Sequence, residues 1–116
     1  MEKIADAFIV KIEPAALRHL AVICEISKVA GPRWYKRSYL KKEIAHHRTL
    51  VAFVGKIPAG FLIWNRDFWG YYFIDLLVVH PELRRRGVAK ELLDAMDKIA
   101  EGKKLFSSTN QSNKVM

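Results

Sequence analysis

Hydrophobic and polar residues form two kinds of pattern along this chain, and short apolar runs mark β-strands. Runs of β-branched, aromatic and other apolar residues, bounded by glycine, proline or asparagine, are typical of strands. Such runs occupy five segments: Phe8–Ile12, Thr49–Val54, Ala59–Trp64, Tyr71–Val79 and Lys104–Ser108. The fourth is apolar on both faces except at Asp75, which is typical of a central strand covered on both sides.

A spacing of three or four residues between apolar positions marks three helices, because residues so spaced lie on one helical face. Val88–Ala100 has this spacing at Val88, Leu92, Met96 and Ile99, and Gly102 ends it. Two earlier segments are predicted to be helical in the same way: Ala15–Ala30, with apolar residues at 17, 20, 21 and 24 before Gly31-Pro32, and Arg33–Arg48, with Leu40, Ile44 and His47 on one face.

The order of these elements, β-α-α-β-β-β-α-β, predicts a single α/β domain over residues 1–116. Turns at Gly55–Pro58 and Asn65–Gly70 join the middle strands into an antiparallel meander. The last strand follows a strand–helix unit and is expected to lie parallel to Tyr71–Val79. We therefore expect a mixed, mostly antiparallel sheet with helices on both faces.

Composition narrows the function classes. The single cysteine, Cys24, excludes an internal disulfide and a cysteine-rich zinc site, and no other metal-ligand spacing is visible. No apolar window approaches the ~18 residues of a membrane helix, and Met1–Asp6 lacks the apolar core of a signal peptide, so we expect a cytoplasmic protein. The net charge of +8 suits two kinds of partner, a nucleic-acid backbone or a small polyanion.

Basic residues and a glycine coincide at one junction between a strand and a helix. Arg84, Gly87 and Ala89 have the spacing R-x-x-G-x-A. The first N–H groups of a helix have no internal partner, and the helix dipole adds partial positive charge there. Glycine lets the backbone approach an oxygen atom closely. The junction therefore predicts a phosphate-binding loop, with a solvated charged turn as the alternative.

In this setting the pattern resembles the acyl-CoA pyrophosphate loop of the GNAT family of N-acetyltransferases, Q/R-x-x-G-x-G/A. Residues 51–63 look like the central hairpin of that family, and residues 107–116 look like its fifth strand and the turn into its fourth helix. The resemblance implies the GNAT-like acyl-CoA N-acyltransferase fold. It also implies transfer of an acetyl group from acetyl-CoA to an amine of a small molecule, peptide or protein, by direct attack in a ternary complex without a metal.

The resemblance further assigns the residues that contact acetyl-CoA. The cofactor is expected between the fourth and fifth strands, where pantetheine pairs with exposed backbone groups. The implied residues are Leu77, Val78 and Val79 on the strand, Arg84, Arg85, Arg86, Gly87, Val88, Ala89 and Lys90 at the loop, and Asn113 at the start of the fourth helix.

Asp75 is the candidate for the general base, because it is an acid within an apolar strand and burial raises the pKa of a carboxyl group. The alternative is that it pairs with a neighbouring polar group or faces water. His80 lies beside the loop and is either a candidate for proton transfer, a common role of histidine, or simply a surface histidine before a proline. His19 and Cys24 are expected to be packing residues.

The chain departs from the family pattern at its C-terminal side, where the pattern continues through a fourth helix and two more strands. That part carries the tyrosine that acts as general acid. All four tyrosines here precede the loop, so none matches it: Tyr35, Tyr39, Tyr71 and Tyr72. A fragment of a longer enzyme, a short form completed by a partner subunit, and an inactive truncated member would each account for this. The open edge of the last strand predicts a homo-oligomer.

The basic segment Arg33–Arg48 supports a second hypothesis, from a different class of function. In this hypothesis the chain is a non-catalytic module that binds nucleic acid or a protein partner through the basic face of that segment. Binding that weakens steeply with salt would favour it. We rank it second, because basic solvated faces are common in proteins of many functions. The strand–loop–helix context described above favours the acetyltransferase instead.

Overall fold

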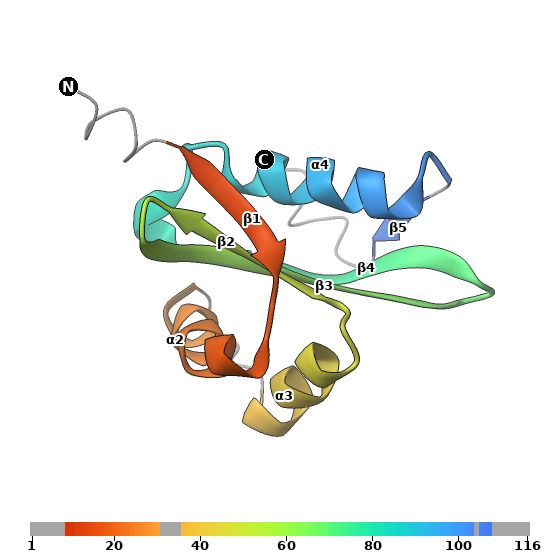
Figure 1. The fold of residues 1–116 in the computed structure, drawn as a ribbon, viewed down its shortest axis with the longest axis horizontal. Helices are drawn as coiled ribbons and strands as arrows, with labels where there is room; N and C mark the ends of the chain where they lie inside the picture. The colour runs from red at the N-terminus through yellow and green to blue at the C-terminus, as the bar shows by residue number, and fades with distance from the viewer. Residues whose placement is uncertain (1–8, 31–35, 104, 108–116) are drawn as a thin grey trace.

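The computed structural model describes residues 9–30, 36–103 and 105–107. Its strands form one sheet in the spatial order β1-β2-β3-β4-β5 (Figure 1). Neighbouring strands are antiparallel except β4 and β5, which are parallel, so the expected mixed sheet is confirmed. The strands are β1 (Val10–Pro14), β2 (Thr49–Val54), β3 (Ile57–Phe68), β4 (Tyr71–Val79) and β5 (Leu105–Ser107).

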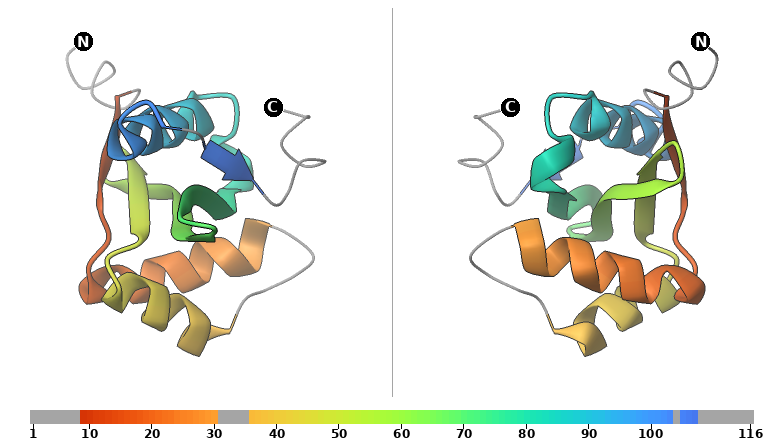
Figure 2. Two further views of the ribbon diagram at one scale, coloured as in Figure 1. Left: turned by 90° about the vertical axis from the view of Figure 1, so that its right-hand side faces the viewer. Right: turned by 90° about the vertical axis from the view of Figure 1, so that its left-hand side faces the viewer.

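Helices cover both faces of the sheet, as predicted (Figure 2). On one face lie α2 (Leu20–Ala30) and α3 (Arg37–Ala45), and on the other lies α4 (Val88–Ala100). Two 3-10 turns, η1 (Leu17–His19) and η2 (Pro81–Leu83), precede α2 and α4. Within the described residues, no helix is both long and apolar enough to cross a membrane.

The sheet separates two hydrophobic cores. The α2–α3 core is built from Ala15, Leu20, Ile23, Ile26, Leu40, Ile44, Val51, Phe61, Ile63 and Leu76. The α4 core is built from Leu50, Ala52, Val54, Ala59, Leu62, Ile74, Val88, Leu92 and Met96. Strand residues alternate between the two cores because successive side chains of a strand point to opposite faces. β4 contributes to both cores and is therefore covered on both sides, as its apolar sequence predicts.

Two of the predicted helices differ from the observed ones. The first begins with η1, and its buried face carries Leu20, Ile23 and Ile26, whereas Leu17 of the predicted stripe is 53% exposed. Contacts with the sheet decide which of two overlapping apolar stripes is buried. The second helix ends at Ala45 rather than Arg48, because His47 adopts the left-handed conformation (φ 61°). Its predicted start at Arg33 lies outside the described residues.

The hairpin of β3 and β4 is longer than its sequence indicates. The predicted turn Asn65–Gly70 is wrong: β3 continues to Phe68, and the turn consists of Trp69 and Gly70. The polar residues Arg66 and Asp67 can continue a strand here because they are exposed, on a part of the hairpin that extends past α3 (Figure 1). Between β2 and β3, the predicted turn Gly55–Pro58 shortens to Gly55 and Lys56.

Gly60 allows β3 and β4 to approach closely. A Cβ atom at this position would lie 2.6 Å from the Val78 carbonyl oxygen and 3.3 Å from Cγ1 of Val88. The missing side chain thus makes room both for the neighbouring strand and for the first residue of α4. The N-terminus of α4 is thereby held against the end of β4.

Candidate functional site

The loop between β4 and α4 is anchored at both ends in the α4 core. Leu83 packs against that core, and Val88 is only 1% exposed. Between them Arg84, Arg85 and Arg86 are exposed. The predicted basic loop is therefore a short exposed segment held between two fixed points.

The backbone of this loop is shaped by local hydrogen bonds. The His80 imidazole accepts from the Glu82 N–H through Nδ1 (3.1 Å), and the Leu83 N–H donates to the His80 carbonyl (2.9 Å). Arg85 and Gly87 then both adopt positive φ, 68° and 80°. Arg84 before them is extended (φ −70°, ψ 157°), so the backbone changes direction sharply just before α4. His80 thus shapes the turn before the loop.

Gly87 is the N-cap of α4 and supplies no side-chain cap. The first helical hydrogen bond runs from the Glu91 N–H to the Gly87 carbonyl (3.0 Å). The N–H groups of Val88, Ala89 and Lys90 therefore have no acceptor within the helix. With the helix dipole, these groups make the start of α4 suitable for binding an anion. The structure brings the sequence-predicted residues Arg84 to Ala89 together at this point.

Lys90 forms an ion pair along α4. Its Nζ lies 2.8 Å from Oδ2 of Asp94, one turn further on. This hydrogen bond, together with the charge of Asp94, raises the pKa of Lys90 above its usual value. Lys90 therefore stays charged at neutral pH, but its ammonium is already shared with a carboxylate.

The peptide groups at the end of β4 point alternately to its two neighbours. The His80 N–H donates to the Ala59 carbonyl (2.8 Å), and the Val78 carbonyl lies against Gly60, so both face β3. Because peptide groups of a strand alternate in direction, those of Leu77 and Val79 point away from β3, to the β5 side. The described pairing of β4 with β5 runs only from Tyr72 to Ile74.

Asp75 occupies a β-bulge. In the pairing of β3 with β4, Ile63 faces Leu76 and Trp64 faces Ile74, so Asp75 is the extra residue that the register passes over. The Tyr39 hydroxyl on α3 donates a hydrogen bond to Oδ2 of Asp75. Asp75 and the next residue, Leu76, thus both lie on the α2–α3 side of the sheet, which uninterrupted alternation would forbid. Asp75 thus pairs with a neighbouring polar group, and its role as the general base stays a prediction.

Tyr39 is the residue of this site that sequence reasoning missed. It lies 36 residues from Asp75 along the chain, and no local pattern relates the two. Asn113, expected at the cofactor, lies outside the described residues. Of the basic segment on the second predicted helix, Arg37, Lys41 and Lys42 are exposed on α3.

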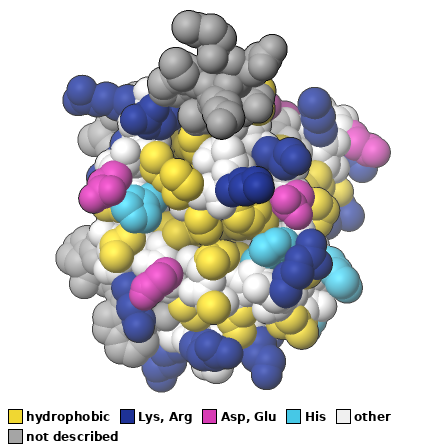
Figure 3. Space-filling view, turned by 60° about the vertical axis from the view of Figure 1, so that its left-hand side comes forward, with side chains coloured by type: hydrophobic (Ala, Val, Ile, Leu, Met, Phe, Trp, Pro, Cys, Tyr) yellow, Lys and Arg dark blue, Asp and Glu magenta, His cyan; other side chains and the backbone are white. Residues whose placement is uncertain are grey.

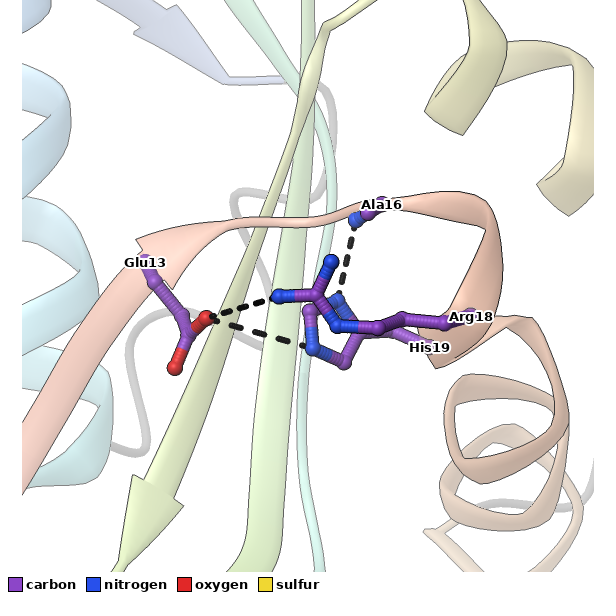
Figure 4. A network of polar contacts seen from close by, with 4 residues as sticks. All are labelled: Glu13, Ala16, Arg18 and His19. Atoms are coloured by element: carbon purple, nitrogen blue, oxygen red, sulfur yellow. Dashed lines mark hydrogen bonds and ion pairs between the residues drawn. The ribbon is translucent and has the colours of Figure 1, made fainter.

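His19 has a structural role (Figure 4). Its Nδ1 accepts from the Ala16 N–H (2.9 Å), and its Nε2 lies 3.9 Å from Oε1 of Glu13. The ring also packs 5.8 Å from Phe53, between centroids. The expectation of a packing residue is confirmed, with a capping hydrogen bond added.

An apolar groove of about 230 Å³ lies between α2 and the start of β3. It is lined by Val22, Glu25, Ile26, Val29, Ile57, Pro58 and His80. Figure 3 shows hydrophobic side chains gathered near the middle of one face, with lysine and arginine side chains around them. Among the described residues, no three His, Cys, Asp or Glu side chains are grouped as a metal ion requires.

Comparisons with known proteins agree with this geometry. The sequence model of the acetyltransferase (GNAT) family matches residues 15–115. No curated protein sequence matches the chain. A GNAT-family acetyltransferase from Bacillus cereus ATCC 10987 has a similar structure, with 28% identity and a TM-score of 0.81 over 92% of this chain and 78% of that one.

Two further solved structures share the fold at lower identity. Ard1 from Thermoplasma volcanium is 18% identical, with a TM-score of 0.72 over 79% of this chain and 64% of its own, so this chain spans less than two thirds of it. The PaiA N-acetyltransferase from Thermoplasma acidophilum, solved in complex with coenzyme A, is 17% identical. Its TM-score is 0.64 over 80% of this chain and 72% of its own.

Proposed function

Since the chain belongs to the acetyltransferase (GNAT) family, we propose that it binds acetyl-CoA and transfers the acetyl group to an amine. The observation that carries the proposal is the exposed loop Arg84–Gly87 at the uncapped start of α4, with Arg85 and Gly87 both in the left-handed conformation. A diphosphate is the anion that suits a row of N–H groups flanked by arginines.

Each part of the cofactor has a matching set of groups in the chain. The N–H groups of residues 85 to 89 would bind the pyrophosphate, with charge added by Arg84, Arg86 and Lys90. Pantetheine amides would pair with the peptide groups of Leu77 and Val79, which point away from β3. The expected backbone contact from Val78 is left out, because its carbonyl faces β3 and its side chain packs against the α2–α3 core. The coenzyme A complex of the PaiA enzyme supports this assignment of the ligand.

The proposed chemistry is direct attack of the amine on the thioester. Asp75 takes one proton from the acceptor ammonium, and the freed nitrogen lone pair forms the bond to the acetyl carbon. The bond from that carbon to sulfur breaks, and the sulfur leaves as a thiolate, which takes up the second proton that the nitrogen loses as the neutral amide forms. A backbone N–H of β4 polarises the thioester carbonyl in the manner of an oxyanion hole.

The test is an isothermal titration of the chain with acetyl-CoA, using Gly87→Val and Gly70→Val as a matched pair. Both glycines have nearly the same φ, 80° and 81°, and at neither would a Cβ meet an atom within 4 Å. The two variants therefore carry similar backbone strain, but only one alters the loop. We expect micromolar binding by the wild type and by Gly70→Val, and at least tenfold weaker binding by Gly87→Val.

A second ligand shows whether the loss of affinity in Gly87→Val comes from the pyrophosphate. Acetyl-pantetheine lacks the pyrophosphate, so it should bind the wild type and Gly87→Val equally well. Unchanged affinity of Gly87→Val for acetyl-CoA would refute the assignment of the loop. Absence of acetyl-CoA binding by the folded wild type would refute the proposed function.

A further inference from the structure

The bond between Tyr39 and Asp75 joins two elements that approach the site from different directions. Tyr39 comes from α3, which covers one face of the sheet, and Asp75 comes from the bulge of β4. The bulge interrupts the pairing of β3 with β4 just before the segment Leu76–Val79. The peptide groups that are proposed to face the cofactor lie in this segment. A carboxylate at this point therefore lies beside the proposed path of pantetheine.

The hydrogen bond from Tyr39 restricts the orientation of the Asp75 carboxylate. An aspartate has two rotatable side-chain bonds, and a hydrogen bond to one carboxylate oxygen limits rotation about both. A hydroxyl that donates to a carboxylate forms a charge-assisted hydrogen bond, which is about twice as strong as a neutral one. Both side chains are partly buried, so solvent competes less for this bond.

Tyr39 is itself held in place by the core. Leu40 and Ile44, its neighbours on α3, are 0% and 2% exposed and fix the helix on the sheet. The Tyr39 ring packs against the α2–α3 core. The hydroxyl therefore reaches Asp75 from a rigid support, which is what orientation of a reacting group requires.

We propose that Tyr39 is a positioning residue for acetyl transfer: its hydroxyl fixes the Asp75 carboxylate toward the acceptor amine on the α3 side of β4. This inference rests on the proposed function. Tyr39 exchanges no proton with the substrate in this scheme. It acts through Asp75, and its removal should matter only while Asp75 is present.

The test is a double-mutant cycle of Tyr39→Phe and Asp75→Asn. Release of the coenzyme A thiol is followed with three amine probes: spermidine, a peptide with a free N-terminal alanine, and an N-terminally blocked peptide with one lysine. Tyr71→Phe is the matched control, since it removes a hydroxyl from the same strand as Asp75 while its ring contact with Phe106 (5.5 Å between centroids) remains. Acetyl-CoA affinity and melting temperature are measured for every variant.

We expect Tyr39→Phe to lower kcat about tenfold, equivalent to about 1.4 kcal/mol of transition-state stabilisation. The KM for acetyl-CoA should stay within twofold of the wild-type value, because the loop and the β4 peptide groups are untouched. In the Asp75→Asn background the same substitution should have no further effect on kcat. Tyr71→Phe should behave as the wild type.

Two outcomes would overturn the inference. A Tyr39→Phe variant as active as Tyr71→Phe would show that the hydroxyl plays no part in transfer. An equal loss of kcat in both backgrounds would show a structural effect that does not pass through Asp75. Failure of the proposed function looks different: the wild type would then not bind acetyl-CoA, or would release no thiol with any of the three amines.

Discussion

Replacement of Gly60 by alanine should destabilise the fold by forcing β3 and β4 apart. The added Cβ would lie 2.6 Å from the Val78 carbonyl oxygen, about 0.8 Å inside the 3.4 Å at which ordinary contacts begin. The obstacle is backbone, which cannot rotate away as a side chain does. The second neighbour, Cγ1 of Val88 at 3.3 Å, belongs to a buried residue and has little room to move.

The expected cost follows from this overlap. Overpacking of a well-packed interior costs about 1–3 kcal/mol. For a chain of 116 residues this corresponds to a fall in melting temperature of roughly 4–12 °C. Alanine is otherwise favoured over glycine in a strand, by about 0.5–1 kcal/mol. A net loss of stability would therefore be due to the overlap.

Urea unfolding of the wild type, Gly60→Ala and Gly70→Ala would measure the effect. Gly70→Ala introduces backbone strain without overlap, and its cost should be smaller. Because Val78 and Val88 lie beside the proposed cofactor contacts, Gly60→Ala should also weaken acetyl-CoA binding at temperatures where it remains folded. A Gly60→Ala variant within 0.5 kcal/mol of the wild type would refute the claim that this glycine sets the separation of the strands.

Two further predictions concern other parts of the molecule. His19→Ala should lower the free energy of unfolding by about 1–3 kcal/mol, because the buried ring caps the Ala16 N–H and packs on Phe53; equilibrium unfolding in urea would check this, and an unchanged midpoint would contradict it. β5 is the last strand of the described sheet and should pair with a second copy, so sedimentation at micromolar concentration should detect a dimer, whereas a monomer would count against pairing at this edge.

The sequence predicts the fold and the position of the basic loop between β4 and α4 well, because both depend on local patterns. Arg84, Gly87 and Ala89 lie within six consecutive residues, and the strand before them and the helix after them have clear periodicities. The amphipathic stripe of α4 was predicted in the correct phase, since Val88, Leu92 and Met96 are all buried. The polar residues Lys90, Glu91, Asp94, Asp97 and Lys98 all lie on one side of this helix, so its apolar residues form a single broad face.

Features that depend on contacts between distant segments could not be predicted. In α2 two apolar stripes overlap, and only contact with the sheet selects Ile23 and Ile26 over Leu17. The polar end of β3 has the composition of a turn, but pairing with β4 holds it extended. The hydrogen bond from Tyr39 to Asp75 requires both the bulge and the placement of α3, and the sequence near these residues predicts neither.

The bulge at Asp75 has a consequence for how this chain can change. An extra residue in a regular strand would exchange the two faces of everything after it. Here the bulge absorbs Asp75, and Ile74, Leu76 and Leu77 continue to serve the two cores in turn, as though residue 75 were not there. Position 75 is therefore an extra position in the strand, and its side chain is part of neither hydrophobic core. A different functional group can be tried there while the architecture stays intact, so chemistry and folding can diversify independently at this point.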